Sequence, residues 1–423
     1  MRVLLVSKSP LRKEISSGNT FINTFESFEN VELAAICTKS DIPDPKITKY
    51  YYVTEKILIK NILRKSAAGV VGNRQREKEN VASCAPKKKM ILPRWTVFFW
   101  IQDLLWKIGN WKTQELEKFV EEYNPDVIFS VLSNYSYLNN LILHVHALSN
   151  AKLVLYAWDN NYSLQQFILS PLRWIKHFID RASMRKLASK TDLFYVISET
   201  QEKDYEKCFH KACTVLTKGA DFSEPPEFKN QYKAPLQIVF TGNIALNRWK
   251  SLKLIADALD NINKDEIKAQ LRIYTATPLT RKMKKALVRN ESSFIMGSIP
   301  ASEVARIQEK ADILVHVEAL DLKNKLTVRQ SFSTKIVDYL KAARPILAVG
   351  PKDVASIDHL IRNDCAIVAD NRRELEEKLR AVLSNESELN RIAQNAYECG
   401  RRHHNKQDIQ TMLMNDLKKV CDK

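Results

Sequence analysis

A hydroxyl, an ammonium and a carboxylate fall on one face of a helix expected in the second half of the chain. Four residues follow the i, i+3, i+4, i+7 spacing of one helix face: Ser331, Thr334, Lys335 and Asp338. The helix follows a β-branched run at residues 312–317, typical of a buried parallel strand. Ligands bind at such strand-to-helix loops in open α/β sheets, and these groups suit the phosphates and ribose of a nucleoside diphosphate. A solvated helix face with a Lys335–Asp338 pair is the alternative.

A second group of cations follows the strand expected at residues 237–241. Gly242 would let the backbone approach a ligand there. At the next helix start, Arg248 can bind two phosphate oxygens at once, whereas Lys250 or Lys253 would act as a point charge. These cations are expected where a phosphate would lie, although one of them alone could be an ordinary surface residue.

Strand-like runs alternate with helical segments along most of the chain, which predicts parallel sheets. A chain of 423 residues suits two domains, and the polar, proline-containing stretch from residue 218 to 235 is the best boundary. We predict an α/β protein with two doubly wound, Rossmann-like domains, residues 1–225 and 226–400. Residues 401–423 are expected to form a helix that packs back on the first domain.

Charge and cysteine content narrow the class of partner and the compartment. Lys and Arg number 66 against 49 Asp and Glu, a net charge of +17 that favours a polyanion, an anionic membrane or negatively charged small substrates. The seven cysteines are scattered without metal-ligand spacing, so reduced thiols in a cytoplasmic protein are expected, with no metal and no cofactor. No stretch reaches the roughly 20 apolar residues of a membrane-spanning helix.

Several motifs for phosphate binding and catalysis are missing from the sequence. The turn after the first strand lacks Gly-x-Gly-x-x-Gly, which argues against hydride transfer. Neither a phosphate-loop motif nor a Gly-x-Ser-x-Gly elbow is present, which argues against an ATPase and a hydrolase of those types. The metal-binding Asp-x-Asp pair of many nucleotide-sugar enzymes is also missing. A bound diphosphate would therefore depend on cationic side chains and helix ends.

Residues 46–111 interrupt the strand and helix alternation. Basic residues far outnumber acidic ones up to residue 89, and an apolar, tryptophan-rich segment follows at 95–106. This combination is typical of a helix lying in a membrane interface. The predicted membrane contacts are Trp95, Phe98, Phe99, Trp100 and Trp106. A buried helix under a surface loop is the alternative, but a second basic and aromatic helix from residue 171 favours the membrane.

Four segments together resemble the GT-B glycosyltransferases of the family four type. They are residues 194–201, 218–222, 240–244 with Arg248, and 333–347. The resemblance implies two Rossmann-like domains facing across a cleft, with a nucleotide sugar held by the second domain and an acceptor by the first. It also implies a retaining, metal-independent sugar transfer. Bacterial members of this group commonly build capsular or exopolysaccharide.

The resemblance also assigns roles to individual positions. The implied catalytic residues are Arg248, Lys250 and, beside the acceptor, Asp159. The implied donor-binding residues are Gly18 and Asn19 in the loop after the first strand, Gly242, Asn243, Lys253, Ser333, Thr334, Lys335 and the ribose contact Asp338. Gln330 departs from the family pattern, which has an acidic residue eight positions before the ribose contact. Candidate sugar contacts are therefore Gln330 itself and, as substitutes in the preceding loop, Glu318 and Arg329.

The leading interpretation is a glycosyltransferase that moves a sugar from a nucleoside diphosphate to a lipid-linked or oligosaccharide acceptor. The expected place is the cytoplasmic face of a membrane, on an anionic surface, in the synthesis of cell-surface polysaccharide. Two alternatives stay open. One is a GT-B nucleotide-sugar epimerase or hydrolase, and the other is a basic membrane- or nucleic-acid-binding protein without catalysis. Nucleic acid is not an expected partner, because the sequence shows no aromatic stacking platform and no helix-turn-helix signature.

Overall fold

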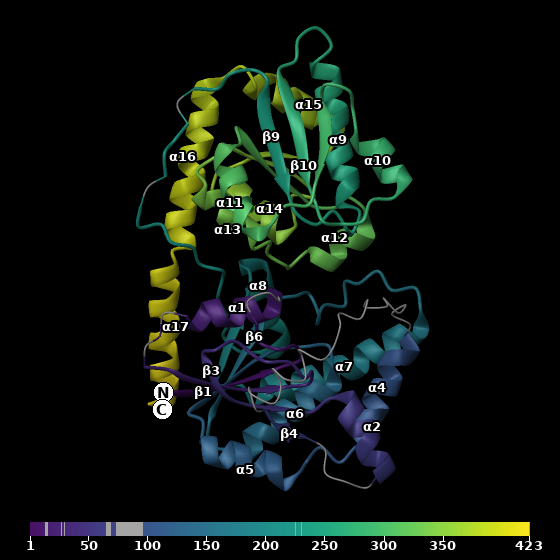
Figure 1. Ribbon diagram of the computed structural model, residues 1–423, viewed down its shortest axis with the longest axis vertical. Coiled ribbons are helices and arrows are strands. Elements are labelled where there is room, and N and C mark those ends of the chain that lie inside the picture. The colour runs from purple at the N-terminus through teal and green to yellow at the C-terminus, as the bar shows by residue number, and fades with distance from the viewer. Residues whose placement is uncertain are drawn as a thin grey trace.

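The computed structural model shows two α/β domains, one above the other in Figure 1. It describes residues 1–12, 16–26, 28, 30–64, 69–72, 96–224, 226–229 and 231–422. The predicted fold class is confirmed, since each domain has one largely or wholly parallel sheet between layers of helices.

The first domain is built on an eight-stranded sheet in the order β4-β3-β2-β1-β5-β6-β7-β8, in which only the β3–β4 pair is antiparallel. Its strands are β1 (Arg2–Ser7), β2 (Glu32–Cys37), β3 (Ile47–Tyr52), β4 (Val70–Val71), β5 (Val127–Val131), β6 (Lys152–Ala157), β7 (Leu193–Val196) and β8 (Thr214–Val215). Its helices are α1 (Ser16–Phe25), α2 (Glu55–Arg64), α4 (Thr96–Ile108), α5 (Gln114–Tyr123), α6 (Ser136–Ala147), α7 (Pro171–Ser189) and α8 (Glu199–Phe209). Strand β1 is buried on both faces, because Val3 and Leu5 enter one core and Leu4 and Val6 the other.

The second domain has a six-stranded parallel sheet in the order β11-β10-β9-β12-β13-β14. Its strands are β9 (Leu236–Thr241), β10 (Ala269–Tyr274), β11 (Ser293–Gly297), β12 (Ile313–Val317), β13 (Ile346–Val349) and β14 (Ile367–Ala369). Its helices are α9 (Arg248–Ile262), α10 (Arg281–Leu287), α11 (Ala301–Lys310), α12 (Leu322–Val328), α13 (Lys335–Lys341), α14 (Ala355–Arg362), α15 (Arg372–Val382) and α16 (Glu386–His403). The strand order reverses beside β9 and β12, so the loops after these two strands open at one edge of the sheet.

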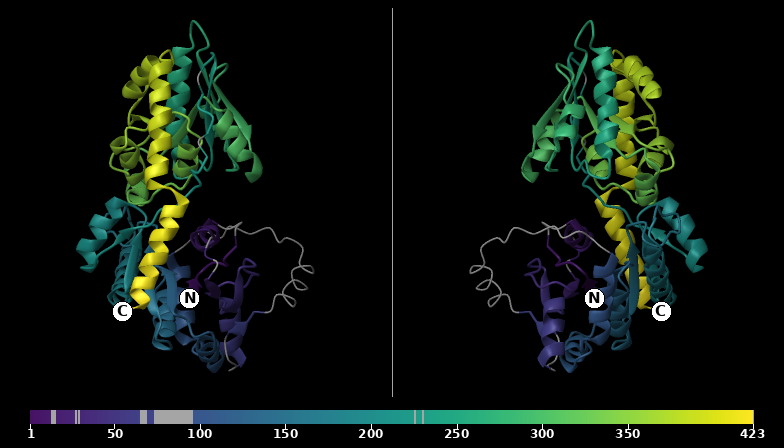
Figure 2. Two further views of the ribbon diagram at one scale, coloured as in Figure 1. Left: turned by 90° about the vertical axis from the view of Figure 1, so that its left-hand side faces the viewer. Right: turned by 90° about the vertical axis from the view of Figure 1, so that its right-hand side faces the viewer.

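The C-terminal helix α17 (Lys406–Cys421) returns to the first domain, as the two side views of Figure 2 show. Tyr195 donates a hydrogen bond through its hydroxyl to Asp416 at 2.9 Å, and the Gln410 amide donates to the carbonyl of Asn23 at 3.1 Å. The two domains are therefore joined by two chain crossings, the 216–235 segment and the α16–α17 junction.

Direct contacts between residues of the two domains also hold them together. The Asn160 amide donates to the carbonyl of Leu326 at 2.8 Å. Ser198 is the N-cap residue of α8, and its hydroxyl donates to the carbonyl of Gln330 at 2.7 Å. These bonds fix the loop after β6 against α12, and the start of α8 against the segment between α12 and α13.

The aromatic helix α4 is amphipathic, and one of its predicted membrane contacts is wrong. Trp106 is only 2% exposed and stacks on Tyr137 with ring centroids 4.6 Å apart, because it faces the core of the first domain. Phe98 is exposed, whereas Phe99 and Trp100 are half-buried. Trp95 lies outside the described residues. In the part of the chain that the structure describes, no helix has the length and apolar composition to span a bilayer.

Candidate functional site

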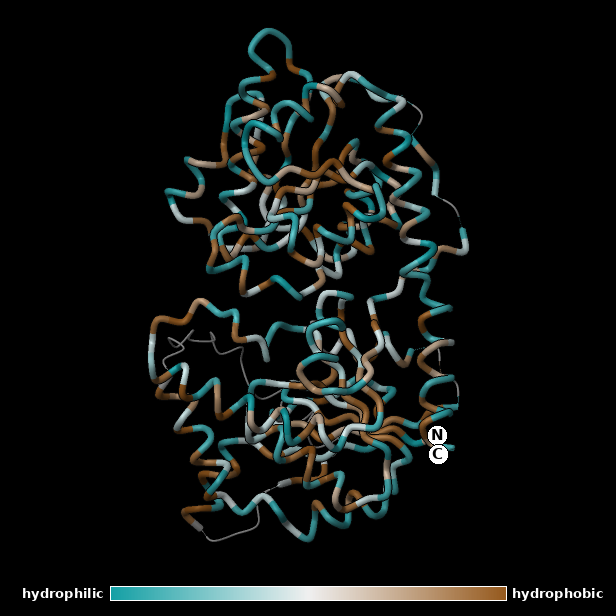
Figure 3. Tube along the Cα trace, turned by 180° about the vertical axis from the view of Figure 1, so that it is seen from behind, coloured by the Kyte–Doolittle hydropathy of each residue, from teal (hydrophilic) through white to brown (hydrophobic). Residues whose placement is uncertain are grey.

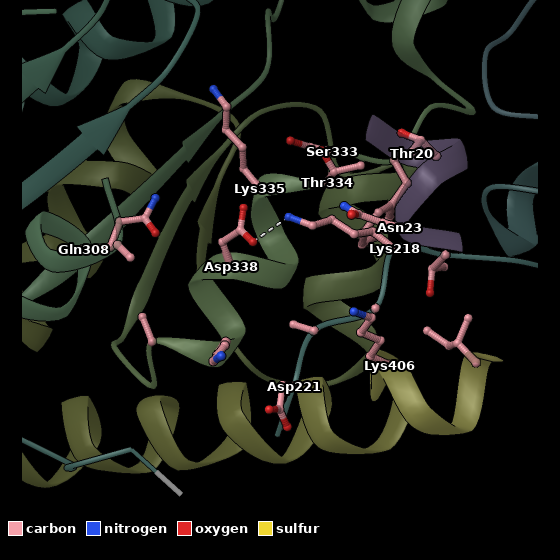
Figure 4. A pocket seen from close by; sticks show the side chains of 18 of the residues that line it. Thr20, Asn23, Lys218, Asp221, Gln308, Ser333, Thr334, Lys335, Asp338 and Lys406 are labelled. Atoms are coloured by element: carbon pink, nitrogen blue, oxygen red, sulfur yellow. Dashed lines mark hydrogen bonds and ion pairs between the residues drawn. The ribbon is translucent and has the colours of Figure 1, made fainter. Parts of the chain in front are cut away.

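A cleft of about 1540 Å³ lies between the two domains (Figure 4). The first domain contributes Thr20 and Asn23 of α1 and Asp159 after β6. The second contributes the start of α9, the loop after β12 and the start of α13. The cleft thus opens at the carboxyl ends of the parallel strands, where open α/β sheets bind ligands.

Arg248, the first residue of α9, lines the cleft in a fixed orientation. Its Nε and Nη2 donate to the two carboxylate oxygens of Glu318, both at 3.0 Å, and Ser251 donates to the Glu318 carbonyl at 2.6 Å. Glu318 is only 3% exposed, and burial raises the pKa of its carboxyl against the opposing effect of Arg248. The neighbouring His316 stays neutral, because burial, Arg248 and Lys335 lower its pKa to about 3. The predicted sugar contact Glu318 therefore holds an arginine at the cleft wall.

Lys335 reaches from the start of α13 across to the end of β9. Its Nζ donates to the carbonyl of Thr241 at 3.2 Å. Burial, with Arg248 as the second cause, lowers the pKa of its ammonium to about 8, although Glu318 and Asp338 oppose the change. Arg248 and Lys335 are therefore close enough for their positive charges to repel one another. An anion bound between them would relieve that repulsion.

Gly242 makes room for Lys335. A Cβ built at this position would lie 1.7 Å from Lys335 Nζ, and the backbone has φ +152°, a conformation that favours glycine. The Gly242→Ala variant is therefore expected to displace the ammonium from the Thr241 carbonyl and to weaken nucleotide binding about tenfold or more. Isothermal titration with a nucleoside diphosphate measures this, and Gly297→Ala is the matched control. Gly297 also has positive φ (+85°), but a Cβ there meets nothing within 4 Å. Equal nucleotide affinity in the Gly242→Ala variant and the wild type would contradict the expectation.

Asp338 points into the cleft and pairs with a residue that the site prediction missed. Lys218 Nζ lies 2.5 Å from Asp338 Oδ1, the interaction dashed in Figure 4. The Lys335–Asp338 pair considered as an alternative does not form, since Lys335 points toward Thr241. Lys218 begins the 218–222 segment, which contributed to the family resemblance, so that segment was the signal that could have revealed it.

Ser333 and Thr334 both line the cleft just before α13. The backbone N–H of Ser333 is not free to bind phosphate, because it donates to the Ser356 hydroxyl at 3.0 Å. Helix α13 begins at Lys335, so Ser331 precedes the helix, although its side chain still lines the cleft. The sequence spacing brought these residues together even though the helix is shorter than predicted.

Four predicted site residues on or just before α9 lie outside the cleft lining, namely Gly242, Asn243, Lys250 and Lys253. On a helix of 3.6 residues per turn, positions two and five after Arg248 are rotated by about 200° and 140° from it. Lys253 accordingly forms an ion pair with Asp257, and Lys250 is exposed. Asn243 accepts hydrogen bonds from the Ala245 N–H at 2.7 Å and the Thr277 hydroxyl at 3.2 Å, which stabilise the turn before α9.

Gly18 and Asn19 lie in the first turn of α1 and not in a loop, which corrects the sequence prediction. A Cβ at Gly18 would be 2.4 Å from the backbone N and O of Arg12, so glycine lets this turn pack closely on the preceding loop. The side chain of Asn19 is outside the described atoms. From the same helix, Thr20 and Asn23 line the cleft (Figure 4).

Arg329 and Gln330 face the first domain and not the cleft. Arg329 Nη2 and Gln330 Nε2 each lie 2.5 Å from Asp204 Oδ2 on α8. Neither residue lines the cleft, so the structure does not bring these two predicted sugar contacts to it. The amide of Gln330 can donate a hydrogen bond to Asp204, which an ionised Glu at the same position could not do.

Asp159 lines the cleft from the first domain, directly after β6. Its side chain is open to the cleft, yet desolvation by the surrounding protein raises the pKa of its carboxyl. The Gln201 amide donates to its backbone carbonyl at 3.0 Å. Asp159 is not the N-cap of the next helix, since α7 begins only at Pro171 after the cap residue Ser170.

Comparisons with known proteins agree with this arrangement. Residues 235–385 match the family model described as glycosyl transferases group 1. The predicted resemblance to GT-B glycosyltransferases is thereby confirmed. The matched part of this glycosyltransferase-like chain includes Arg248, Glu318, Lys335 and Asp338. No curated protein sequence matches the chain.

Solved structures with very different sequences share the whole fold. HepE of Anabaena in complex with UDP has a TM-score of 0.63 at 13% identity, and sucrose-phosphate synthase from Thermosynechococcus elongatus has 0.62 at 10%. The α,α-trehalose-phosphate synthase (UDP-forming) from Burkholderia vietnamiensis has 0.57 at 9%. Each alignment covers 99% of this chain and 99% or 100% of the other. The two-domain architecture is therefore GT-B, as predicted.

No metal centre is evident within the described ranges, where no group of three or more His, Cys, Asp or Glu side chains is placed to hold a metal ion. Metal independence of the reaction stays a prediction, since the resemblance implies it and no measurement addresses it. The charged groups that line the cleft from the second domain include Arg248 and Lys335, with the carboxylates of Glu318 and Asp338 beside them.

Proposed function

We propose that the protein is a retaining glycosyltransferase that transfers a sugar from a nucleoside diphosphate to a lipid-linked or oligosaccharide acceptor. The proposed role is the synthesis of cell-surface polysaccharide at the cytoplasmic face of a membrane, against an anionic lipid surface. The transfer is proposed to need no metal ion and no other cofactor.

The observation that carries this proposal is the pair of cations at the donor side of the cleft. Arg248, oriented by a buried carboxylate, and Lys335, placed over Gly242, belong to the domain that matches glycosyl transferases group 1. A diphosphate between them would neutralise both charges. Asp338 could accept hydrogen bonds from ribose hydroxyls once Lys218 moves aside. HepE, which shares the fold, binds UDP and UDP-glucose in its solved structures, so UDP-sugars are the first donors to test.

The chemistry assigned to these residues is electrostatic. When the bond between the sugar C1 and the diphosphate oxygen breaks, negative charge grows on the leaving diphosphate. Arg248 and Lys335 stabilise this growing charge more than they stabilise the bound donor, which lowers the activation barrier. The acceptor oxygen forms the new bond to C1 and its proton passes to the departing diphosphate oxygen, so no protein nucleophile is required.

Asp159 is the group that we assign to the acceptor. It faces the same cleft from the first domain, and its raised pKa makes it a stronger base than an exposed aspartate. In the proposed reaction it accepts a hydrogen bond from the acceptor hydroxyl and orients that hydroxyl toward C1. Because Asp159 follows β6 in the first domain, it lies across the cleft from the second-domain residues to which we assign the donor.

A panel of nucleotide sugars tests the donor assignment directly. A true donor binds only the folded protein and is expected to raise its melting temperature. The Asp338→Ala variant is expected to bind the same nucleotide about 10- to 100-fold more weakly, because a hydrogen bond to a charged carboxylate is lost. Asp353→Ala is the matched control, since Asp353 also pairs with a lysine, Lys325 at 2.9 Å, but lies outside the cleft lining.

Product analysis separates transfer from the alternative reactions. If free sugar forms without an acceptor, the protein is a hydrolase. If an epimerised nucleotide sugar forms, it is an epimerase, and either result would contradict the proposed sugar transfer. If no nucleotide sugar stabilises the protein, the donor site assignment is wrong.

A further inference from the structure

The first part of helix α7, residues 171–181, has its polarity inverted relative to an ordinary surface helix. Its buried side includes Lys176, Asp180 and Arg181, and Lys176 is only 7% exposed. Its outward side carries large apolar residues, of which Leu172 is 55% exposed. The others on that side are Ile175, Phe178 and Ile179. A helix that faces water normally shows the opposite arrangement, so α7 is suited to an apolar environment on its outer side.

The buried charges of α7 are paired, and they attach α7 to α4. Lys176 Nζ lies 2.9 Å from Asp103 Oδ2 on α4 and also pairs with Asp180 in the next turn of α7. The Ser136 hydroxyl donates to Asp180 at 2.6 Å. Because these groups satisfy one another inside the protein, the two helices are held in one orientation with their apolar sides outward.

Helix α4 and its neighbours extend this outward apolar surface. The exposed residues of α4 follow the i, i+4, i+7, i+11 spacing of one helix face: Val97, Ile101, Leu104 and Ile108. Helix α2, which packs on α4, exposes Ile59, Ile62 and Leu63, and the loop before α7 exposes Leu164, Phe167 and Leu169. The three helices lie together at one side of the first domain in Figure 1, and Figure 3 shows the hydrophobic turns along this side.

We propose that this surface, termed the apolar face (α2, α4 and residues 164–179), inserts into the interface of a lipid bilayer that contains anionic headgroups. Charge complementarity selects this partner. Among the described residues of α2, α4 and α7, every exposed ionisable side chain is basic: Lys56, Lys60, Lys107, Arg173, Arg185 and Lys186. Two acidic residues there are half-buried and engaged, Glu55 with the Gln102 amide at 2.6 Å and Asp103 with Lys176. Apolar residues surrounded by basic ones suit a helix layer at the headgroup boundary.

A second copy of the chain suits this surface less well. In a symmetric dimer formed through the apolar face, the basic side chains of both copies would be brought together, and like charges across an interface are costly. An anionic lipid surface supplies the opposite charge at the rim of the apolar residues and a hydrocarbon layer beneath them. Because the apolar residues belong to folded helices held by buried ion pairs, little ordering is needed on binding.

The inference deepens the proposed reaction at a membrane, and it rests on the surface of the first domain and not on the cleft. The two are connected in the chain, since Asp159 lines the cleft and the segment that follows it runs into the apolar face. Asn160 fixes the start of that segment against the second domain through Leu326. A protein docked in this way would hold the acceptor side of its cleft near the lipid headgroups.

Co-sedimentation of the full chain with vesicles tests the inference. Wild type is expected to bind vesicles that contain phosphatidylglycerol more strongly than vesicles of phosphatidylcholine alone, and less strongly at high salt. The variant I101S/L104S/L172S/I175S is expected to bind these vesicles with an affinity at least about tenfold lower than that of wild type. The reason is that it removes apolar area that would enter the lipid. The control V288S/M296S changes two apolar residues that are 47% and 45% exposed but lie on the second domain, and it is expected to bind as wild type does.

Three results would overturn the inference. They are equal vesicle binding by wild type and the quadruple variant, no vesicle binding by wild type, and a wild-type dimer that the quadruple variant converts to a monomer without any lipid dependence. UDP binding by the quadruple variant is expected to match wild type. A variant that loses vesicle binding but keeps UDP binding therefore tests the apolar face alone. The proposed function is tested separately, by UDP binding in variants of the cleft residues.

Discussion

Sugar transfer by the Arg248→Ala variant is expected to be about 10²- to 10³-fold slower than in wild type. This is the range found when one preorganised donor to a developing negative charge is removed. Arg248 is preorganised here by the bidentate contact with Glu318, so its guanidinium does not have to reorient as charge appears on the diphosphate. Steady-state kinetics with a nucleotide sugar measure the effect, which is expected mainly in kcat.

The same substitution has a stability effect that must be separated from catalysis. Removing Arg248 leaves the carboxylate of Glu318 buried without its partner, which costs about 3–5 kcal/mol in comparable buried pairs. The double variant R248M/E318Q replaces the charged pair by neutral groups of similar size and is expected to regain most of that stability. If the double variant also regains sugar transfer, Arg248 only supports the fold and its assigned role is wrong.

Donor binding is expected to weaken as the pH rises through about 8, because Lys335 loses its proton in the free protein near that value. A bound diphosphate raises the pKa of this ammonium again, so binding above pH 8 takes up a proton. UDP affinity is therefore expected to be constant below pH 8 and to fall about tenfold per pH unit above it, until the pKa of the complex is reached. Titration calorimetry in buffers of different ionisation enthalpy measures both the affinity and the proton uptake.

Two substitutions at Lys335 make this pH dependence specific. Lys335→Arg keeps a charge throughout this range, so its UDP affinity is expected not to fall between pH 8 and 9. Lys335→Met is expected to bind UDP weakly at every pH. Folding lowers the pKa of Lys335, so the protonated lysine destabilises the native state below pH 8, and that cost disappears as the pH rises from about 8 toward 10.5. Lys335→Met is therefore expected to unfold at a temperature no lower than wild type at pH 7, which distinguishes lost binding from misfolding. An identical pH profile for wild type and Lys335→Arg would contradict the assignment.

The sequence predicted much of the donor side of the cleft, and helix register explains where it did not. Arg248 and Lys335 were identified from residue type and from their place after parallel strands, and both line the cleft. Lys250 and Lys253 were equally plausible by composition. They lie outside the cleft lining because α9 begins at Arg248, and rotation along the helix turns the later lysines away.

Contacts between distant segments could not be predicted in the same way. Lys218 reaches Asp338 across 120 positions of sequence, and Gln330 reaches Asp204 across 126. Neither pair has a local pattern, because each depends on how the two domains meet. The aromatic helix α4 shows the same limit, since its composition suggested a membrane contact but only packing showed that Trp106 faces inward.

By itself, the sequence determined the α/β class, the two-domain plan and the strand ends that open on the cleft. These features follow from hydrophobic periodicity and from the rule that parallel strands open their ligand sites at one edge. Only the tertiary structure decided which cations share the cleft, which carboxylate holds Arg248, and which side of α7 faces outward. Those outcomes depend on burial and on pairing between residues far apart in the chain. The ion pairs of buried Lys176 with buried Asp180 and half-buried Asp103 are the clearest case, because they hold charge inside and leave apolar side chains outside.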